Sequence, residues 1–434
     1  MLLKYRNNRK FTLVVLVCVM ALLAAACSSA ADETTTTTAT SGDTQATTTT
    51  TGATPTTAAD AEPIVIGGSL GLTGAFAGPS AGYKASYDYW LEQINANGGL
   101  LGRPVEMIIY DDESTPATAQ SLYERLINQD KVDLLLAPYT TFVGGAIIPV
   151  AEAAEMVIFN GGFVGIGLFK ASDWIVGAWS YQEPDYPRGV FEFIDTLPAD
   201  QRPTRVGIAT AQNPFTIVVR EGFEGYGGVL NFAAERGMEV VVDEQYPGDV
   251  TDVSGIIQKA IAEDVDLFFN LALPNDAGLV ARTAYDLGFK PSIYCACGSQ
   301  VTALPYWPEL GAAGEGIMSS TTAWPVGGAP GSAELFQYLQ DTVDYKQLPA
   351  HASTAYAVLQ VLQQAVEGAG TLDQATIRDY VTGKSFETVN GVLTYDEDRI
   401  PAYRQLVLQF IGGENRVIYP PDRATGGDAV VPMP

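Results

Sequence analysis

The stretch Ile64–Asp112, IVIGGSLGLTGAFAGPSAGYKASYDYWLEQINANGGLLGRPVEMIIYDD, combines two short apolar runs with a helical pattern between them. Its first residues, 64–66, form a short apolar run that stops at glycines, which is typical of a buried parallel strand. Residues 80–97 carry apolar side chains at helical spacing, and Gly98-Gly99 end that helix. The apolar run 105–110 predicts a second strand. A strand, a helix and a strand in this order predict a βαβ unit with a right-handed crossover.

The same alternation of short apolar runs and helical spacing continues along the chain. Further strands are expected at 132–137, 156–159, 205–209, 239–243, 266–271, 292–295, 405–410 and 416–419. Helical segments are expected at 115–129, 142–154, 215–236, 252–263, 275–287, 333–344 and 353–369. Strands separated by helices of this length predict parallel sheets with helices on both faces, and the two series predict an α/β protein of two doubly wound, Rossmann-like lobes.

The composition of the 434-residue chain excludes several classes of function. A formal net charge of −26 argues against nucleic-acid binding, which needs cations to replace the counterions of phosphate. The single histidine, His351, excludes a multi-histidine metal site. Neither a G-x-G-x-x-G nor a G-x-x-x-x-G-K-[ST] phosphate loop occurs, so neither a cofactor nor a metal is expected.

The N-terminal segment has the pattern of an export signal. Lys4, Arg6, Arg9 and Lys10 precede a nearly all-apolar stretch, 11–26, which is shorter than the ~20 residues of a membrane span. Its end, Ala24-Ala25-Ala26-Cys27, resembles a bacterial lipoprotein signal, which implies cleavage after residue 26 and a lipid on the Cys27 thiol. The alternative is an uncleaved membrane anchor. Both interpretations place the rest of the chain at the extracytoplasmic face of the cell membrane.

The segment 27–62 is predicted to be a lipidated cysteine followed by a tether. Threonine runs dominate it, and from Ala31 to Glu62 it has no Val, Ile, Leu, Met or aromatic residue. Such a sequence buries too little apolar area to offset the entropy of ordering it, so we expect a disordered spacer between the lipid and a globular body.

Three features resemble the branched-chain-amino-acid (Leu/Ile/Val)-binding type of periplasmic solute-binding protein, which serves ABC importers. The first is Gly71-Leu72-Thr73-Gly74, followed by a helix that ends in Ile94-Asn95-Ala96-Asn97-Gly98-Gly99-Leu100-Leu101-Gly102-Arg103 and by a strand into Tyr110-Asp111-Asp112. The second is Gly391-Val392-Leu393-Thr394-Tyr395-Asp396, which is similar to a hairpin near the end of family members. The third is the order of strands and helices from Pro63 to about Tyr419.

The resemblance implies two lobes joined by three hinge crossings, the type I periplasmic-binding-protein fold. Lobe 1 would hold residues 63–183 and 301–395, lobe 2 would hold 184–300 and 396–420, and 421–434 would be a C-terminal tail. It further implies a lipid-anchored substrate-binding protein that closes on a small amino acid or amide and docks on an ABC permease. The bilayer would be a second partner, through acylated Cys27. Open parallel sheets bind ligands beyond the carboxyl ends of their strands, which agrees with a site between the lobes.

The resemblance also assigns a candidate site for the ligand carboxylate. Thr140 and Thr141 follow a predicted strand, and Thr141 matches best the family position that contacts the carboxylate. A plain threonine N-cap is the alternative and is compatible with binding. Gly162 follows the next strand, where glycine permits close backbone approach, and Phe163 could line an apolar pocket.

An acid and two aromatic residues complete the candidate set. Asp276 matches the family position that binds the ligand ammonium, although an aspartate in the first turn of a helix also favours the helix dipole without any ligand. Phe76 and Phe215 lie near positions that line the family's pocket, and their alternative is a place in the core.

Two cysteines remain once Cys18 leaves with the leader and Cys27 carries lipid. Cys295 and Cys297 form an i,i+2 pair, which in extended chain lies near the upper Cα–Cα limit of ~6.8 Å for a disulfide. An exported compartment favours oxidation. Both the bridged and the free form stay open from sequence.

Two other functions remain as alternatives. Gly67-Gly68-Ser69-Leu70-Gly71 fits the G-x-S-x-G nucleophile elbow, with His351 downstream in the order of an α/β-hydrolase. Against this, the motif would lie on the first strand of the domain, and Leu72-Thr73-Gly74 interrupts the helix that should follow. The chain could also report its ligand to a membrane receptor instead of a transporter. The preferred interpretation is a non-enzymatic binding protein.

Overall fold

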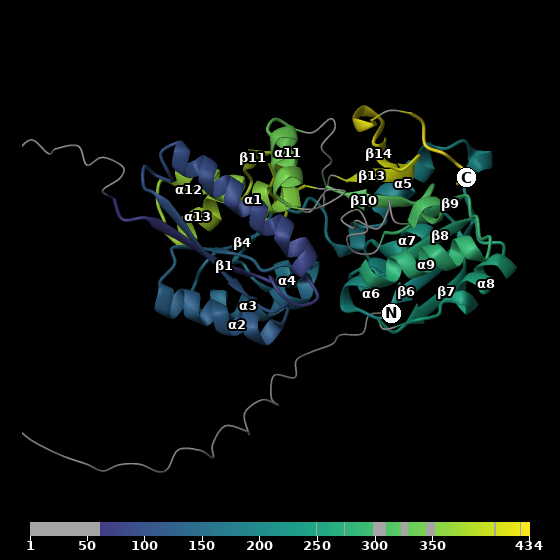
Figure 1. Cartoon of the computed structure of the whole chain (residues 1–434), viewed down its shortest axis with the longest axis horizontal. Helices are drawn as coiled ribbons and strands as arrows, with labels where there is room; N and C mark the ends of the chain where they lie inside the picture. The colour runs from purple at the N-terminus through teal and green to yellow at the C-terminus, as the bar shows by residue number, and fades with distance from the viewer. Residues whose placement is uncertain are drawn as a thin grey trace, which may run out of the picture. The chain divides into compact units, whose positions relative to one another are not determined.

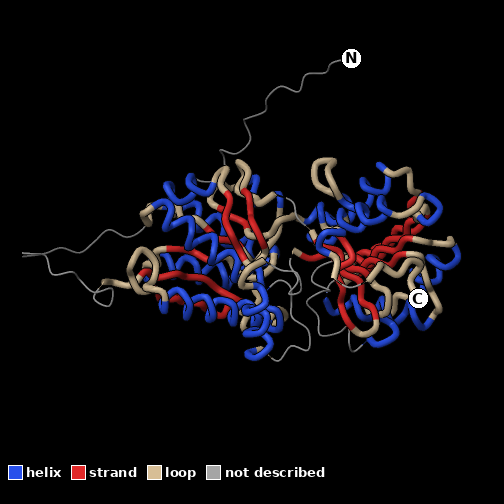
Figure 2. The backbone as a smooth tube through the Cα atoms, turned by 90° about the horizontal axis from the view of Figure 1, so that it is seen from above, coloured by secondary structure: helices blue, strands red, loops and turns tan. Residues whose placement is uncertain are grey.

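The computed structural model describes residues 61–248, 250–272, 274–297, 310–322, 329–343, 352–402, 405–425 and 427–434. Its strands form two large sheets and one hairpin (Figure 1). Each large sheet lies within its own set of helices, and the strands appear as separate red groups in Figure 2. No helix in the described ranges has the length and apolar character that crossing a membrane requires.

The first sheet is entirely parallel and has the order β2-β1-β3-β4-β5. Its strands are β1 (Ile64–Leu70), β2 (Val105–Asp111), β3 (Leu134–Leu136), β4 (Ile158–Asn160) and β5 (Ile175–Gly177). The helices around it are α1 (Ala77–Ala96), α2 (Pro116–Arg125), α3 (Thr141–Ala153), α4 (Ile166–Ala171), α11 (Ser332–Thr342), α12 (Ala352–Ala369) and α13 (Gln374–Val381). With the hairpin β11 (Ser385–Thr388) and β12 (Gly391–Thr394), these elements make up lobe 1.

The second sheet has the order β14-β13-β10-β9-β8-β6-β7. Its β10–β13 and β13–β14 pairs are antiparallel, and its other pairs are parallel. Its strands are β6 (Arg205–Ala211), β7 (Glu239–Tyr246), β8 (Leu267–Leu271), β9 (Ile293–Cys295), β10 (Met318–Thr321), β13 (Leu406–Ile411) and β14 (Glu414–Tyr419). The helices of this unit, lobe 2, are α5 (Arg188–Thr196), α6 (Pro214–Glu221), α7 (Gly228–Glu235), α8 (Ser254–Ala262) and α9 (Pro274–Asp286).

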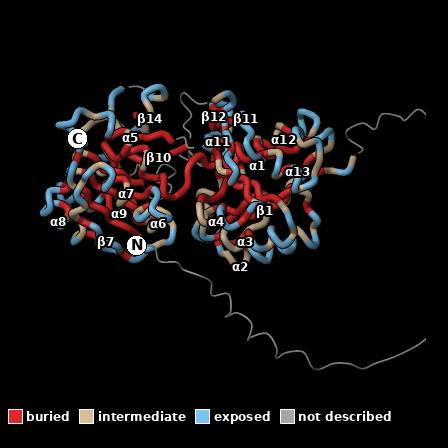
Figure 3. The backbone as a smooth tube through the Cα atoms, turned by 180° about the vertical axis from the view of Figure 1, so that it is seen from behind, coloured by how far each residue is buried: buried red, intermediate tan, exposed pale blue. Residues whose placement is uncertain are grey.

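Each sheet is buried on both faces, as the apolar runs predict. In lobe 1, one cluster joins the sheet to α1, α12 and α13, and another joins it to α2 and α3. In lobe 2, α5, α6 and α7 pack on one face and α8 and α9 on the other. Figure 3 shows the strands in the buried colour and much of the outer helix surface as exposed. The two-lobed α/β architecture predicted from sequence is confirmed.

The sheets place some segments differently from the boundaries expected from sequence. β10 belongs to the second sheet, although residues 301–395 were expected in lobe 1. Residue 399 still belongs to lobe 1, because Gly177 N–H donates to the Arg399 carbonyl at 3.1 Å. The C-terminal segment packs on lobe 2, where Met433 N–H donates to the Ser292 carbonyl at 3.0 Å.

The region 215–236 is helical, as expected, but it divides into α6 and α7. Gly222, Gly225 and Gly227 have positive φ between the two helices, and so does Gly228, the first residue of α7. A β-carbon on Gly222 would lie 2.3 Å from the Gly227 carbonyl oxygen, so this turn needs glycine for space as well as for backbone conformation.

Candidate functional site

The loops that follow β3 and β4 meet at the carboxyl edge of the first sheet. Thr140 N–H donates to the Gly162 carbonyl at 2.9 Å. A β-carbon on Gly162 would lie 2.1 Å from the Pro138 carbonyl oxygen, so the two backbones approach as closely as only glycine permits. The predicted residues Thr140 and Gly162 are therefore brought together.

A buried asparagine fixes the loop after β4. The Asn160 side chain accepts hydrogen bonds from Gly162 N–H at 3.0 Å and Phe163 N–H at 2.9 Å. Its amide also donates to the Phe163 carbonyl at 2.9 Å. Asn160 thus satisfies three backbone groups of a buried loop, a role that the sequence patterns above do not assign to it.

The two predicted threonines both bond to protein groups. Thr140 is the N-cap of α3, and its hydroxyl accepts from Phe142 N–H at 3.3 Å. The Thr141 hydroxyl donates to the Val164 carbonyl. The N-cap interpretation therefore describes Thr140, which adopts the uncommon φ of 75°. Thr140 accepts from the N–H groups of Phe142, Val143 and Gly144, so it caps the first turn of α3, whose positive dipole end favours an anion.

Phe163 lies in the core. Its side chain is 1% exposed and belongs to the apolar cluster beneath α2 and α3. The ring is so close to α3 that a β-carbon on Gly144 would lie 2.3 Å from it. In this structure the residue supports α3 from inside, which is the packing alternative to a place in a ligand pocket.

A row of aromatic side chains begins in lobe 1 beside these loops. The Tyr139 ring lies 6.0 Å from that of Phe76 and 4.9 Å from that of Tyr83, in edge-to-face arrangements. The Gly161 carbonyl accepts from the Tyr83 hydroxyl at 2.7 Å and from the Trp179 indole N–H at 2.9 Å. Burial raises the pKa of Tyr83, so its hydroxyl stays protonated and donates.

The row continues along the chain into lobe 2. Ring centroids are 6.0 Å apart for Trp179 and Tyr181, 4.7 Å for Tyr181 and Tyr186, and 5.0 Å for Tyr186 and Phe215. Phe215 opens α6, where its N–H donates to the Asn213 side chain at 3.0 Å. The two predicted phenylalanines, Phe76 and Phe215, thus lie at the two ends of this row, whose two halves meet at the Gly161 carbonyl through Tyr83 and Trp179.

The sequence patterns above do not select Trp179, Tyr181 or Tyr186 as site residues. The signal that could have found them is the density of aromatic side chains directly after the apolar run Ile175–Gly177. Side chains at the carboxyl ends of parallel strands face the usual position of a ligand.

Asp276 lies in lobe 2, in the first turn of α9, and is 5% exposed. Burial raises the pKa of the neighbouring Tyr246, and the negative charge of Asp276 raises it further. Nearby, the Asn270 amide donates to the Tyr294 hydroxyl at 3.0 Å. Asp276 therefore has a polar, largely buried setting.

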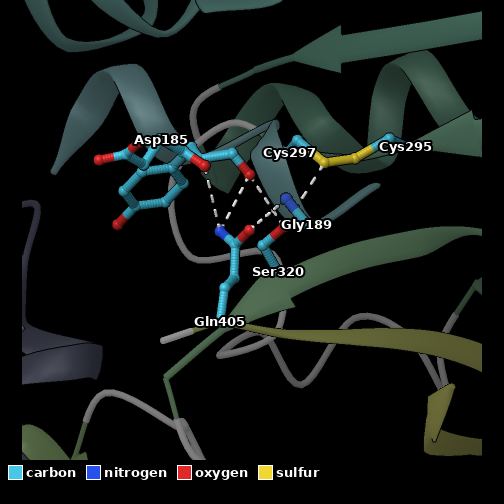
Figure 4. The surroundings of a disulfide bond; sticks show 7 residues. Asp185, Gly189, Cys295, Cys297, Ser320 and Gln405 are labelled. Atoms are coloured by element: carbon cyan, nitrogen blue, oxygen red, sulfur yellow. Dashed lines mark hydrogen bonds between the residues drawn. A yellow bond between two sulfur atoms is a disulfide. The ribbon is translucent and has the colours of Figure 1, made fainter. Parts of the chain in front are cut away.

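One carbonyl connects the three chain segments that pass between the lobes (Figure 4). The Tyr186 carbonyl, on the first crossing, accepts from the Ser320 hydroxyl at 2.9 Å and from the Gln405 amide at 3.1 Å. Ser320 lies in β10, which precedes the second crossing, and Gln405 lies at the end of the third. The Gln405 side-chain oxygen also accepts from Gly189 N–H at 2.6 Å. We call these four residues the hinge network.

Cys295 and Cys297 are joined by a disulfide, with Cα atoms 5.3 Å apart. Both side chains are buried, and the Cys297 sulfur lies 3.9 Å from the Ser320 hydroxyl (Figure 4). The disulfide joins the last residue of β9 to the loop that follows, and the contact with Ser320 places it beside the hinge network.

Glu183 lies on the first crossing and bonds back to lobe 1. Its carboxylate accepts from Ile166 N–H at 2.9 Å, and the neighbouring Gln182 side chain accepts from Gly165 N–H at 2.9 Å. Both accept from the start of α4. Burial raises the pKa of Glu183 to about 7, and the nearby charge of Asp185 adds to this.

The elbow motif does not have the geometry of a nucleophile. Ser69 lies inside β1, is 1% exposed, and donates to the Asp112 carboxylate at 2.8 Å. A nucleophile elbow places its serine on an exposed turn after the strand. His351 and Cys27 lie outside the described residues. Within the described ranges, no group of three or more His, Cys, Asp or Glu is arranged to hold a metal ion.

Comparisons with known proteins agree on the class. A family model described as "Periplasmic binding protein" matches residues 63–411. The Leu/Ile/Val-binding protein BraC3 of Rhizobium johnstonii is 27% identical over 346 residues, which cover 76% of this chain and 87% of the relative.

Two solved structures illustrate the range of ligands within this fold. A branched-chain amino acid transporter substrate binding protein of Streptococcus pneumoniae, in complex with isoleucine, has a TM-score of 0.68 at 18% identity, covering 86% of this chain and 100% of that one. A solute binding protein of an ABC transporter from Rhodopseudomonas palustris, in complex with p-hydroxybenzoic acid, has a TM-score of 0.70 at 20% identity, covering 86% and 98%.

The contact between the two loops predicts a strong effect of Gly162→Ala. The added methyl would meet the Pro138 carbonyl, so we expect the free energy of unfolding to fall by about 1–3 kcal/mol, measured by urea denaturation. Gly145→Ala is the matched control, since its β-carbon would have no neighbour closer than 3.9 Å and alanine favours a helix. Equal stability of the two variants would contradict the described packing.

The buried carboxyl predicts a pH-dependent difference between the wild type and Glu183→Gln. Because the folded-state pKa lies above the ordinary 4.5, the carboxyl's contribution is fully present below that pH and is lost as pH rises through about 7. The variant should therefore become more stable than the wild type by up to about 3 kcal/mol near pH 8. Urea midpoints from pH 4.5 to 8 measure this, and Glu106→Gln, at an exposed site, should show no such divergence.

The hinge network predicts that Gln405→Met destabilises the protein. The substitution keeps the side-chain volume but removes both polar atoms. Gly189 N–H would lose its partner, so the free energy of unfolding should fall by about 1–3 kcal/mol. Gln337→Met, at an exposed position of α11, is the control and should be nearly neutral. Indistinguishable unfolding of both variants in urea would show that Gln405 does not hold the crossings.

Proposed function

The chain belongs to the periplasmic binding protein family, and we propose that it is the extracytoplasmic substrate-binding protein of an ABC importer. The observation that carries this proposal is the family match from residue 63 to 411, which spans both lobes and all three crossings. The 27% identical relative, a Leu/Ile/Val-binding protein, supports an amino-acid-like solute as the ligand.

The proposed ligand site uses the carboxyl ends of both sheets. The ligand carboxylate would take the N-terminus of α3, beside Thr140, Thr141 and the Gly162 backbone. The ammonium would pair with Asp276, where burial strengthens a charge-assisted hydrogen bond. Phe76 and Phe215 would border the apolar part of the ligand.

The proposed mechanism is closure about the crossings. A ligand that contacts both lobes stabilises the closed arrangement by the additional contacts made there, and the population shifts by that difference in affinity. The hinge network would keep the three segments in register while the backbone beyond them bends. The closed form would then dock on a permease, and the solute would be released without covalent change.

Anchoring is proposed from the leader. Lipid on Cys27 would hold the protein at the outer face of the cell membrane, and the segment 27–62 would give the body freedom to reach its permease. A single acyl chain binds membranes only marginally, so stable anchoring requires more than one chain.

A second ligand class, an aromatic carboxylic acid, is favoured by the row of rings from Phe76 to Phe215. Planar rings pack on tyrosine and tryptophan edges and faces, and this contact adds to the area they bury. A structural neighbour bound to p-hydroxybenzoic acid supports this class. It would use the same carboxylate position but would not need Asp276.

Calorimetric titration with branched-chain amino acids, amides and hydroxybenzoates separates the two ligand classes. For an amino acid, Asp276→Asn should weaken binding at least about tenfold, because it removes the partner of a buried ammonium. Hydroxybenzoate binding should be unchanged by the same substitution. Asp286→Asn, at the exposed end of α9, is the charge-matched control. Absence of binding across the whole panel would contradict the proposed function.

A further inference from the structure

A cavity lies in lobe 1, apart from the carboxyl edge of the sheet. It measures about 320 Å³, at the small end of the usual range for ligand sites. Helices α1 and α12 form its walls, and the first turn of α11 with the β11–β12 hairpin forms its rim. These three helices pack on one another, as Figure 1 shows. None of the lining residues belongs to the proposed solute site.

The walls of this cavity are aromatic. Tyr89 and Trp90 of α1 and Tyr356 of α12 line it. The Tyr89 and Tyr356 rings are 5.6 Å apart and tilted by 33°. Tyr338 of α11 stacks on Tyr89 at 4.4 Å and holds this ring in place. Ring faces carry negative charge density, so they attract cations as well as apolar groups.

The charge around the cavity is mostly negative. Glu334 is the only one of its described lining residues that carries a charge at neutral pH, and it is exposed. Its polar lining otherwise consists of amides, with Gln93 and Gln363 among them. The three helices together carry Asp88, Glu92, Glu334, Asp341 and Glu367 against a single lysine, Lys84.

We propose that this cavity binds a small organic cation, with its ammonium group between Glu334 and the tyrosine faces and its apolar body against Trp90. An anionic ligand would be repelled by the Glu334 carboxylate and by the negative ring faces, and the described lining has no Lys or Arg to offset this repulsion. A neutral polyol could bond to the amides but would gain nothing from the acidic surroundings. The cation therefore satisfies more of the observed chemistry than the other two classes.

Titration calorimetry of the whole chain with three matched probes tests the proposal: 2-phenylethylammonium, 3-phenylpropanoate and 2-phenylethanol. The cation should bind at least about fivefold more tightly than either of the others, and added salt should reduce this preference. Equal affinity for all three, or a preference for the anion or the alcohol, would overturn the proposal.

Variants locate the binding. Glu334→Gln should weaken the cation about fivefold, and Asp341→Asn, which removes the same charge from the same helix away from the cavity, less than twofold. Tyr356→Leu should also weaken the cation. Asp276→Asn should leave it unchanged, since that residue belongs to the proposed solute site. Loss of cation binding in Asp276→Asn, or equal effects of Glu334→Gln and Asp341→Asn, would overturn the assignment.

Discussion

The carbonyl oxygen of Tyr186 is the point on which the two-lobed arrangement depends. The Ser320 hydroxyl, in the strand before the second crossing, and the Gln405 amide, at the end of the third, both donate to this oxygen on the first crossing. All three side chains are buried, so a lost partner would leave a polar group without water to replace it. Segments far apart in sequence are therefore held in fixed register where the chain changes lobes.

The loops after β3 and β4, which carry the proposed ligand site, lie outside this hydrogen-bond network. Gly162 lets two loops touch, Asn160 completes their hydrogen bonds, and the Tyr186 ring continues the aromatic row whose ends reach both lobes. The Cys295–Cys297 disulfide borders the same hinge network through Ser320. The proposed site is thus built largely from backbone contacts and buried side chains.

Much of the fold follows from the sequence, because buried parallel strands read as apolar runs and glycine marks where helices end. β10 is not predicted from the sequence, because Met318–Thr321 is short and mostly polar. It forms a strand only through its pairing with neighbours in the sheet. The site is less predictable. Phe163 packs in the core because the Asn160 turn directs it under α3, and the Tyr186 carbonyl meets its partners only after folding. Such contacts join residues more than 130 positions apart and leave no local pattern.

The central claim is that a solute draws the two lobes together about the three crossings. Small-angle X-ray scattering of the chain, with and without a saturating ligand from the calorimetric panel, tests this directly. If the lobes close, the bound state has a smaller radius of gyration and a narrower distribution of interatomic distances. Tight, stoichiometric binding with superimposable scattering curves would contradict it.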